Sequence, residues 1–375
     1  MSDPVPSPAE KAAERALALL ATPSRLAAVV RDRRNAALID LFRSDDQRLS
    51  EQQISIMQRM MRRVIASIED DLRARLVGDP SVAAEEELAA SLASDRVPIA
   101  MPILEQSGLL RDTEFVAALL RRSDSFLLQA RLGEIDIPVE TTTLSDLVDR
   151  ADSELAEAAM ALLIAESRSN DRFGDPVLAV ADLPVAVGTR LYWLIAAALR
   201  EYGVRHHSPQ MAAFDAAVET AGENAIEQHR DEEPVETAAM RVAQLLDRGG
   251  QLDDSVLSEA MVNCRLALYA AMLAMRADIS FEAAWSMALC GDAGSHALVL
   301  RAAGAGAGIA HALIDAVGRA SIPVMDHDIE AVGAIGDYES LSSADAKAAL
   351  YPWRFDRGYR RAIDAVAGVS GGAGQ

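Results

Sequence analysis

Apolar side chains recur at steps of three and four residues over residues 50–77, the most regular hydrophobic pattern in the chain. This spacing is that of one face of an α-helix. Ser50 is a favourable N-cap and Gly78-Asp79-Pro80 is a stop signal, so we predict a single helix over 50–77. Its expected apolar face consists of Ile54, Met57, Met61, Val64, Ile65, Ile68, Leu72 and Leu76.

The rest of the chain has the pattern of shorter helices. Residues 1–8 contain three prolines and are expected to form a loose tail; helical pattern begins at Ala9 and a helix is predicted over 24–43. Residues 168–184 carry Gly and two Pro with little periodicity, which places a boundary there. The helices predicted after it are 184–204, 209–229, 235–248, 255–277, 280–290, 294–303, 307–319, 321–333 and 343–366. No alternating run predicts a strand.

An internal repeat relates residues 118–132 (ALLRRSDSFLLQARL) to residues 146–160 (DLVDRADSELAEAAM). The identical pairs are Leu119/Leu147, Arg122/Arg150, Asp124/Asp152, Ser125/Ser153, Leu127/Leu155 and Ala130/Ala158. Both copies have the pattern of a helix end, a short polar turn and a helix start, and residues 94–104 give a weaker third copy. Asp95, Asp124 and Asp152 are the expected N-caps. A unit of two short helices is typical of a helical solenoid.

Three stretches resemble a family of bacterial proteins. Residues 92–163, 279–303 and 338–363 are similar, in this order, to the family of the domain of unknown function 2336 (DUF2336). The resemblance implies HEAT-like helical repeats and no chemistry. We therefore expect an all-α protein: a HEAT-like α-solenoid array followed by a second helical bundle. The expected domains are an N-terminal tail with long helices (1–80), the repeats (81–170) and a C-terminal helical domain (184–368).

Composition narrows the classes of function. Hydrophobic residues are 50% and aromatic residues 4% of the chain, which suits packed helices better than sheets. The net charge of −21 disfavours nucleic-acid binding without a strong local basic patch. Only Cys264 and Cys290 are cysteines, as expected in a reducing compartment, and both are expected to be buried and inert. The N-terminus has no apolar signal region and the apolar runs are too short for a bilayer, so we expect a soluble cytoplasmic protein without membrane insertion.

Two groups of residues resemble cofactor sites without meeting their requirements. The histidines, at 206, 207, 229, 296, 311 and 327, include no pair with the spacing of zinc ligands, and Asp326-His327-Asp328 would need distant ligands. Gly304-Ala-Gly306-Ala-Gly308 lacks the third glycine of a dinucleotide loop and follows a predicted helix rather than a strand. We interpret it as a helix–helix connection with a C-capping glycine, and predict no metal, no cofactor and no catalytic residue.

His229 is the single candidate for signalling chemistry. His229-Arg-Asp-Glu-Glu-Pro234 weakly resembles the phospho-acceptor box of sensor histidine kinases, although no Gly-rich ATP-binding domain accompanies it. The competing interpretation is a helix end before a proline.

Three hypotheses of function follow from these observations. The leading one is a non-enzymatic protein–protein interaction scaffold or regulatory adaptor, with another protein as partner. The alternatives are a histidine phosphotransfer protein using His229, and a small-ligand sensor with a pocket lined by Trp193, Trp285 and Tyr269. Helix 50–77 places Arg59, Arg62, Arg63 and Arg73 beside a Met-rich stripe, so it is also a possible homodimer contact.

Overall fold

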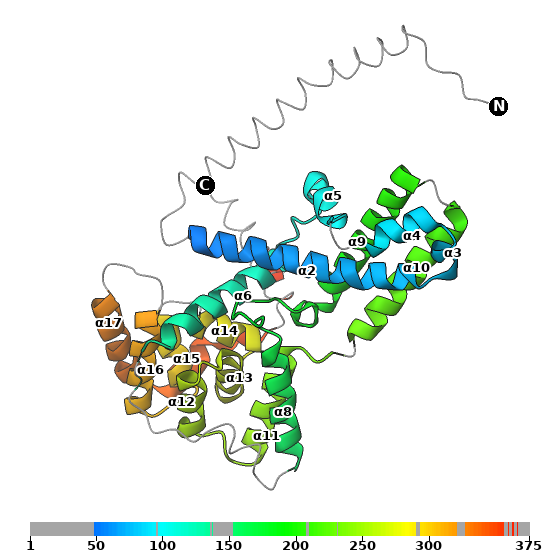
Figure 1. The fold of residues 1–375 in the computed structure, drawn as a ribbon. Helices are drawn as coiled ribbons and strands as arrows, with labels where there is room; N and C mark the ends of the chain where they lie inside the picture. Colours follow the sequence, from blue (N-terminus) through cyan, green and yellow to red (C-terminus); the bar gives the residue numbers. More distant parts are fainter. Residues whose placement is uncertain are drawn as a thin grey trace, which may run out of the picture. The chain divides into compact units, whose positions relative to one another are not determined.

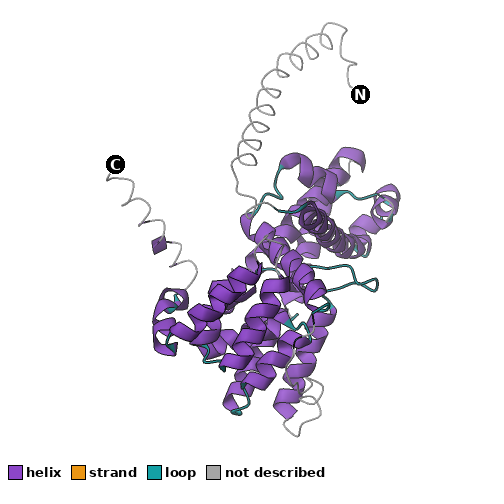
Figure 2. Ribbon diagram, turned by 90° about the vertical axis from the view of Figure 1, so that its left-hand side faces the viewer, coloured by secondary structure: helices purple, strands orange, loops and turns teal. Residues whose placement is uncertain are grey.

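Helices form the secondary structure of the computed structural model, and no strand occurs in the part of the chain that it describes (Figure 1, Figure 2). The structure describes residues 49–94, 97–135, 137, 153–207, 210–230, 232–289, 293–320, 327–355, 359, 362, 363 and 366. The all-α prediction is confirmed. The predictions for residues 1–48, for Asp95, for residues 146–152 of the repeat and for Cys290 lie outside these ranges.

Two hydrophobic cores organise the described helices, and both belong to the second of the chain's two units, Met1–Glu51 and Gln52–Gln375. The helices of the first core are α2 (Glu51–Val77), α3 (Pro80–Ala83), α4 (Glu86–Ala93), α5 (Ala100–Ser107), α9 (Val185–His207) and α10 (Met211–Arg230). Those of the second are α8 (Ser153–Ser167), α11 (Val235–Arg248), α12 (Asp254–Val262), α13 (Leu266–Ala277), α14 (Phe281–Leu289), α15 (Ala293–Ala302), α16 (Ala307–Ala320), α17 (His327–Ser340) and α18 (Ser343–Ala349). Short 3₁₀ turns, η2 (Val180–Asp182) and η3 (Tyr351–Arg354), complete the described elements.

Helix α6 (Thr113–Leu132) connects the cores (Figure 1). Phe115 and Leu119 in its first half are buried in the first core, and Leu128 and Leu132 in its last turns are buried in the second. The polar turn predicted at Ser123-Asp124 is wrong, since α6 continues through it. The physical reason is a tertiary contact: Gln53 Nε2 donates to Asp124 Oδ1 at 2.9 Å, so this carboxylate is engaged away from the backbone that it was expected to cap.

Helix α2 confirms the predicted helix 50–77 and most of its predicted buried face, since Val64, Ile65, Ile68, Leu72 and Leu76 are buried. Ile54, expected inside, is 42% exposed, and Ile56 and Met60 are buried in addition. Arg73, which we placed beside the Met-rich stripe of a possible homodimer contact, is buried together with Glu69. The helix thus buries a charged pair together with its apolar face.

Two other predicted helices are shorter than expected. The helix predicted over 255–277 is broken between α12 and α13, where Cys264 adopts a φ of 54°. The helix predicted over 343–366 ends with α18, and Pro352 lies in the 3₁₀ turn that follows. The helix predicted over 235–248 is confirmed by α11. Residues of α9 and α10 share the first core with those of α2, and the predicted domain limits stay a prediction.

Candidate functional site

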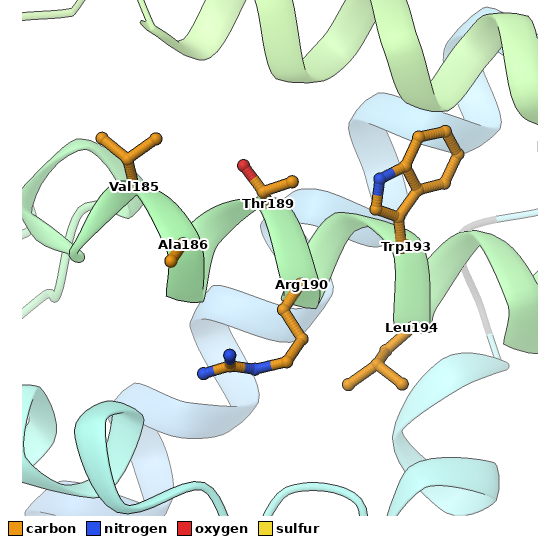
Figure 3. A pocket seen from close by; sticks show the side chains of 6 residues that line it. All are labelled: Val185, Ala186, Thr189, Arg190, Trp193 and Leu194. Atoms are coloured by element: carbon orange, nitrogen blue, oxygen red, sulfur yellow. The ribbon is translucent and has the colours of Figure 1, made fainter.

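An open hollow of about 760 Å³ lies along α9 (Figure 3). Its lining residues are Val185, Ala186, Thr189, Arg190, Trp193 and Leu194. Val185, Thr189 and Trp193 follow one another at four-residue steps and leave the helix on one side, whereas Arg190 and Leu194 leave it on the other. Val185 is 64% and Trp193 39% exposed, so α9 presents apolar surface to solvent at this place.

The Trp193 ring is positioned by a glycine of the neighbouring helix. A Cβ atom at Gly222 of α10 would lie 2.7 Å from Cζ3 of Trp193, so the indole occupies the space that any other side chain at 222 would need. A second glycine of this helix pair makes room for an aromatic ring in the same way. A Cβ atom at Gly203 of α9 would lie 2.6 Å from the ring of Phe214 of α10. Glycine inside a helix costs stability, and here it permits close packing of rings against backbone.

A second hollow of about 450 Å³ lies beside the turn between α5 and α6. It is lined by Met61, Leu104, Glu105, Gly108, Leu110, Arg111, Asp112, Thr113 and Val116. Asp112 links the two hollows, because its carboxylate pairs with Arg190 at 2.5 Å and also accepts from the backbone N–H groups of Glu114 and Phe115 at the start of α6. The N-cap of α6 is therefore also the anchor of an arginine in the first hollow.

Arg122 of α6 forms hydrogen bonds to the loop 168–184, which the sequence predicts to be a boundary. The Arg122 guanidinium donates to Val177 O at 3.0 Å, to Asn170 Oδ1 at 2.9 Å and to Ser169 O. Burial lowers the pKa of Arg122 to about 10, which leaves the side chain charged at neutral pH. Arg122 thus joins α6 to three points on this loop.

The same loop also contacts the segment that connects α10 to α11. Asp182 accepts from the N–H of Val235 at 2.8 Å, and Arg168 donates to Glu233 O at 2.6 Å and pairs with Glu232 at 3.3 Å. Burial raises the pKa of Asp182. These polar groups bind one another and hold the two segments together.

His229 lies near the end of α10 and is half-buried. Its ring stands 5.8 Å from that of Tyr192, and a Cβ at Gly188 would lie 3.8 Å from its Cδ2. Burial is the first cause that raises the pKa of Tyr192 to about 12. The structure thus packs His229 against α9 beside a neutral phenol.

The other histidines are scattered over separate places. His296 is buried, and its Nε2 lies 2.7 Å from Tyr269 Oη; burial lowers its pKa to about 3, so the ring is neutral. His311 Nε2 lies 3.4 Å from Glu339 Oε1, and His206 and His207 both lie against Tyr202. His327 begins α17. Within the described ranges, no three His, Cys, Asp or Glu side chains gather closely enough to hold a metal ion.

The three aromatic residues proposed to line one ligand pocket lie in different surroundings. Trp193 lines the α9 hollow, whereas Trp285 and Tyr269 are buried in the second core. Because Tyr269 is fully buried against His296, it is not available to a ligand at Trp193. The described hollow at Trp193 includes neither Trp285 nor Tyr269, and the shared pocket of these three residues stays a prediction.

The glycine-rich segment 304–308 is a helix–helix connection, as we interpreted it. Gly304 has a φ of 69° after α15, and α16 begins at Ala307. Asp254 accepts from the N–H of Gly306 at 2.7 Å and pairs with Arg276 at 2.7 Å. These groups fix the connection to α12 and α13.

Comparison with known proteins assigns the chain to a family. A family model described as an uncharacterised protein conserved in bacteria (DUF2336) matches residues 138–351, more than half of the chain. The chain belongs to this family, which is the one that its sequence resembles. No curated protein and no solved structure matches it. Among the described helices, none combines the length and the apolar composition that a membrane span requires.

The sequence contains one local signal for the hollow. An isolated glycine inside a helical pattern, such as Gly222 in the predicted helix 209–229, marks a close approach of another element. The ion pair between Arg190 and Asp112 spans 78 residues of sequence and leaves no local signal.

Proposed function

We propose that this chain is a non-enzymatic protein–protein interaction scaffold or regulatory adaptor, and that the α9 hollow binds its protein partner. The observation that carries the proposal is the exposure of Val185 and Trp193 beside a hollow of about 760 Å³. Exposed apolar surface that gathers at one place marks interaction sites in proteins, and tryptophan is over-represented among residues that dominate binding energies.

Side chains that line the hollow are held in place before any partner binds, and this preorganisation supports a binding role for the exposed surface. Trp193 is held by Gly222, and Arg190 is held by Asp112. Side chains that are ordered before binding lose less conformational entropy when a partner arrives.

A HEAT-like repeat arrangement is part of the proposal. In the second core, α12 packs on α13, α13 on α14, α14 on α15, α15 on α16 and α16 on α17, so these helices contact their neighbours in the sequence. This neighbour-on-neighbour packing is what a helical repeat array needs. The unbroken α6 removes the repeat boundary at Ser123-Asp124, so the array we propose begins after this helix.

The remaining properties of the proposed scaffold rest on composition. With only two cysteines, the chain suits a reducing compartment, and we propose a cytoplasmic location. With a net charge of −21, a protein is a more suitable partner for the hollow than a nucleic acid. The homodimer through helix 50–77 stays a proposal; the α2 residues that it needs are those outside the buried face, such as Ile54.

We rank phosphotransfer through His229 below the scaffold. A phospho-acceptor must be reached by a donor, and this ring is half-buried against Tyr192. A small-ligand sensor ranks lower as well, because two of its three expected pocket residues are buried in the second core.

The test is site-specific photo-crosslinking at Thr189, at the centre of the hollow, with the chain expressed in its native host and the crosslinked protein identified by mass spectrometry. We expect one stoichiometric protein, and we expect Val185→Asp to abolish its capture. An aspartate at the first residue of α9 is compatible with the helix dipole, so the fold is preserved.

Val97→Asp is the matched control, since Val97 is also 64% exposed and lies in the loop before α5. It makes the same change in charge and apolar surface elsewhere. A partner captured equally by both variants, or no partner at Thr189, contradicts the proposal.

A further inference from the structure

Helix α10 packs along α9 and borders the α9 hollow. Two contacts show how the helices are aligned. The first is the one between Trp193, which lines the hollow, and Gly222. In the second, Arg200 Nε donates to Asp215 Oδ1 at 2.6 Å. From the first contact to the second, α9 advances by 200 − 193 = 7 residues while α10 goes back by 222 − 215 = 7. The helices are therefore antiparallel, and the residues around Gly222 are those beside the hollow.

Two glutamates of α10 lie at the exposed edge of the Trp193 ring. Gly222 faces α9, and three residues on one flank of it are buried in the first core: Val218, Ala221 and Ala225. On the other flank of Gly222, Glu219 and Glu223 are exposed. Trp193 is 39% exposed, and the buried flank gives no access to solvent, so the exposed part of the indole lies on the side of the glutamates.

The exposed surface of α10 is acidic along its length. Residues 211–229 contain four carboxylates and no lysine or arginine, which gives 0 − 4 = −4. These carboxylates recur at four-residue steps, at Asp215, Glu219, Glu223 and Glu227. Asp215 pairs with Arg200, and among the described residues no arginine or lysine pairs with the three glutamates.

The hollow itself adds no positive charge that would compensate these carboxylates. Arg190 is the one charged residue among residues 185–199, and it pairs with Asp112. The hollow therefore combines apolar surface, at Val185 and Trp193, with a negative border on the side of α10.

We propose that the protein partner of the α9 hollow inserts a basic amphipathic helical segment. Its apolar side chains would contact Val185 and Trp193, and its lysines or arginines would pair with Glu219 and Glu223. An amphipathic helix that lays its apolar face into a groove is a recurrent mode of recognition, and complementary charge selects between such helices. This inference rests on the proposed function and adds the chemistry of the partner.

Charge favours this occupant over the alternatives. The whole chain carries −21, so it attracts a basic segment and repels an acidic segment, a nucleic acid or a second copy of itself. A purely polar cation would pair with the glutamates but would leave Val185 and Trp193 without apolar contacts. A basic amphipathic segment meets both requirements.

The test is a binding titration of the full chain with three fluorescent peptides. The first carries leucine at helical spacing and lysine elsewhere. The second replaces every lysine by glutamate, and the third scrambles the first so that its apolar row is lost. The titration is performed near 0.1 M salt, where the Debye length of about 10 Å screens distant charges. We expect saturable binding of the first peptide, at least about fivefold weaker binding of the third, and none of the second.

Two pairs of substitutions locate the binding. E219Q/E223Q removes the glutamates beside Trp193 and is expected to weaken binding of the basic peptide at least about fivefold. E134Q/E157Q is the matched control, since it makes the same change in net charge at two exposed glutamates of helices α6 and α8 or next to them. It is expected to bind the basic peptide as the unmodified chain does.

Val185→Ser tests the apolar part of the site without adding a charge. Val185 is 64% exposed at the first residue of α9, so we expect weaker peptide binding with an unchanged helical circular dichroism spectrum. The inference is overturned when the basic peptide does not bind, when the acidic or scrambled peptide binds as tightly, when E219Q/E223Q and its control bind equally, or when Val185→Ser has no effect. Self-association that Val185→Ser abolishes, without peptide binding, assigns the hollow to a second copy and also overturns it.

Photo-crosslinking at Thr189 separates the failure of this inference from that of the proposed function. A partner whose crosslinked segment is rich in lysine and arginine, and whose capture E219Q/E223Q weakens, supports both. A captured partner with a neutral or acidic segment overturns the basic occupant and leaves the scaffold in place. If no partner is captured, the scaffold is contradicted and the inference that rests on it falls too.

Discussion

Trp193 of α9 lies against Gly222 of α10 so closely that a Cβ atom at position 222 would be 2.7 Å from the indole Cζ3. The contact between Trp193 and Gly222 therefore packs α9 against α10 and also positions a side chain that lines the hollow. A change at a residue that does not line the hollow should alter it, because the ring has no room to stay in place.

Gly222→Ala is expected to destabilise the protein by about 1–3 kcal/mol, as overpacking of a close contact does. The free energy of unfolding from urea titration measures the effect. Alanine is otherwise the better helix former, so intrinsic propensity predicts the opposite sign. Gly308→Ala in α16 is the control, since no atom lies within 4 Å of its added methyl group, and it is expected to be neutral or stabilising by up to about 1 kcal/mol. Equal effects of the two substitutions would contradict the packing argument.

Glu69 and Arg73 form a buried ion pair inside α2 that also builds the approach to α5. Glu69 accepts from the N–H groups of Ile99 at 2.8 Å and Ala100 at 2.9 Å, and Arg73 donates to Ser94 O at 2.7 Å and Val97 O at 2.8 Å. This pair provides the backbone partners that α5 lacks from a capping side chain of its own.

Glu69→Ala is expected to cost about 3–5 kcal/mol of unfolding free energy, because it leaves a buried guanidinium without its carboxylate. Glu201→Ala removes the carboxylate of a surface pair with the same four-residue spacing, Glu201 with Arg205, and should cost about 0.3–0.5 kcal/mol. Denaturant unfolding of both variants checks the contrast. A small loss for Glu69→Ala would mean that α5 does not depend on the pair.

The sequence predicted helices correctly where the caps and the hydrophobic periodicity agree. Its predictions failed where contacts between residues far apart in the sequence determine the structure. The helix over 50–77 has caps and periodicity that agree, and α2 confirms it. Ser123-Asp124 has the local chemistry of a helix start, yet Gln53 binds Asp124 and Ser123 is fully buried, so α6 runs on. Single-sequence reasoning has no access to a partner 71 residues away.

At Cys264 the sequence predicted a continuous helix, whereas the structure has a break between two helices. Residues 255–277 are continuously apolar enough to predict one helix, but Cys264 has a φ of 54°. Gln129 donates to Cys264 O at 3.0 Å, and Arg265 pairs with Glu166. These contacts from α6 and α8 stabilise a bend for which the local sequence has no glycine or proline.

The contacts of Arg122 predict the dynamics of the loop 168–184. Arg122→Met keeps the aliphatic stem and removes the donors to Val177 O and Ser169 O. Ser169 O still accepts from the N–H of Val177 at 2.8 Å, so the expected cost is about 1–3 kcal/mol for Val177 O, the acceptor left unsatisfied. Amide hydrogen exchange of the loop is expected to accelerate while that of the α9 interior is unchanged.

Arg121→Met is the natural comparison for Arg122→Met, since Arg121 is adjacent on α6 and its pairs with Glu236 and Glu282 are longer, at 3.4 and 4.0 Å. It is expected to leave exchange in the loop unchanged. If both variants accelerate amide hydrogen exchange of the loop equally, the cause is a disturbance of α6 itself and not the loss of the Arg122 hydrogen bonds.

Three partly buried carboxyls are expected to contribute stability that rises on mild acidification. Burial raises the pKa of Asp182, Glu236 and Glu166 above their ordinary values. A carboxyl with a raised folded-state pKa binds its proton more tightly in the folded state. Its contribution to stability is fully present below the unfolded pKa and is lost as the pH rises through the folded pKa.

Asp182→Asn is expected to reduce this pH dependence, because the amide oxygen still accepts from the N–H of Val235 but does not titrate. Urea unfolding between about pH 7.5 and about pH 5 measures it: the free energy of unfolding of the unmodified chain should increase relative to that of the variant as the pH falls. Asp215→Asn is the control, since the pKa of this exposed carboxyl is lowered, chiefly by its hydrogen bond from Arg200, so that it stays ionised throughout this range and the difference from the unmodified chain should stay constant. Parallel curves for the unmodified chain and Asp182→Asn would mean that Asp182 is solvated well enough to keep its ordinary pKa, and that the contact between the loop and Val235 opens in solution.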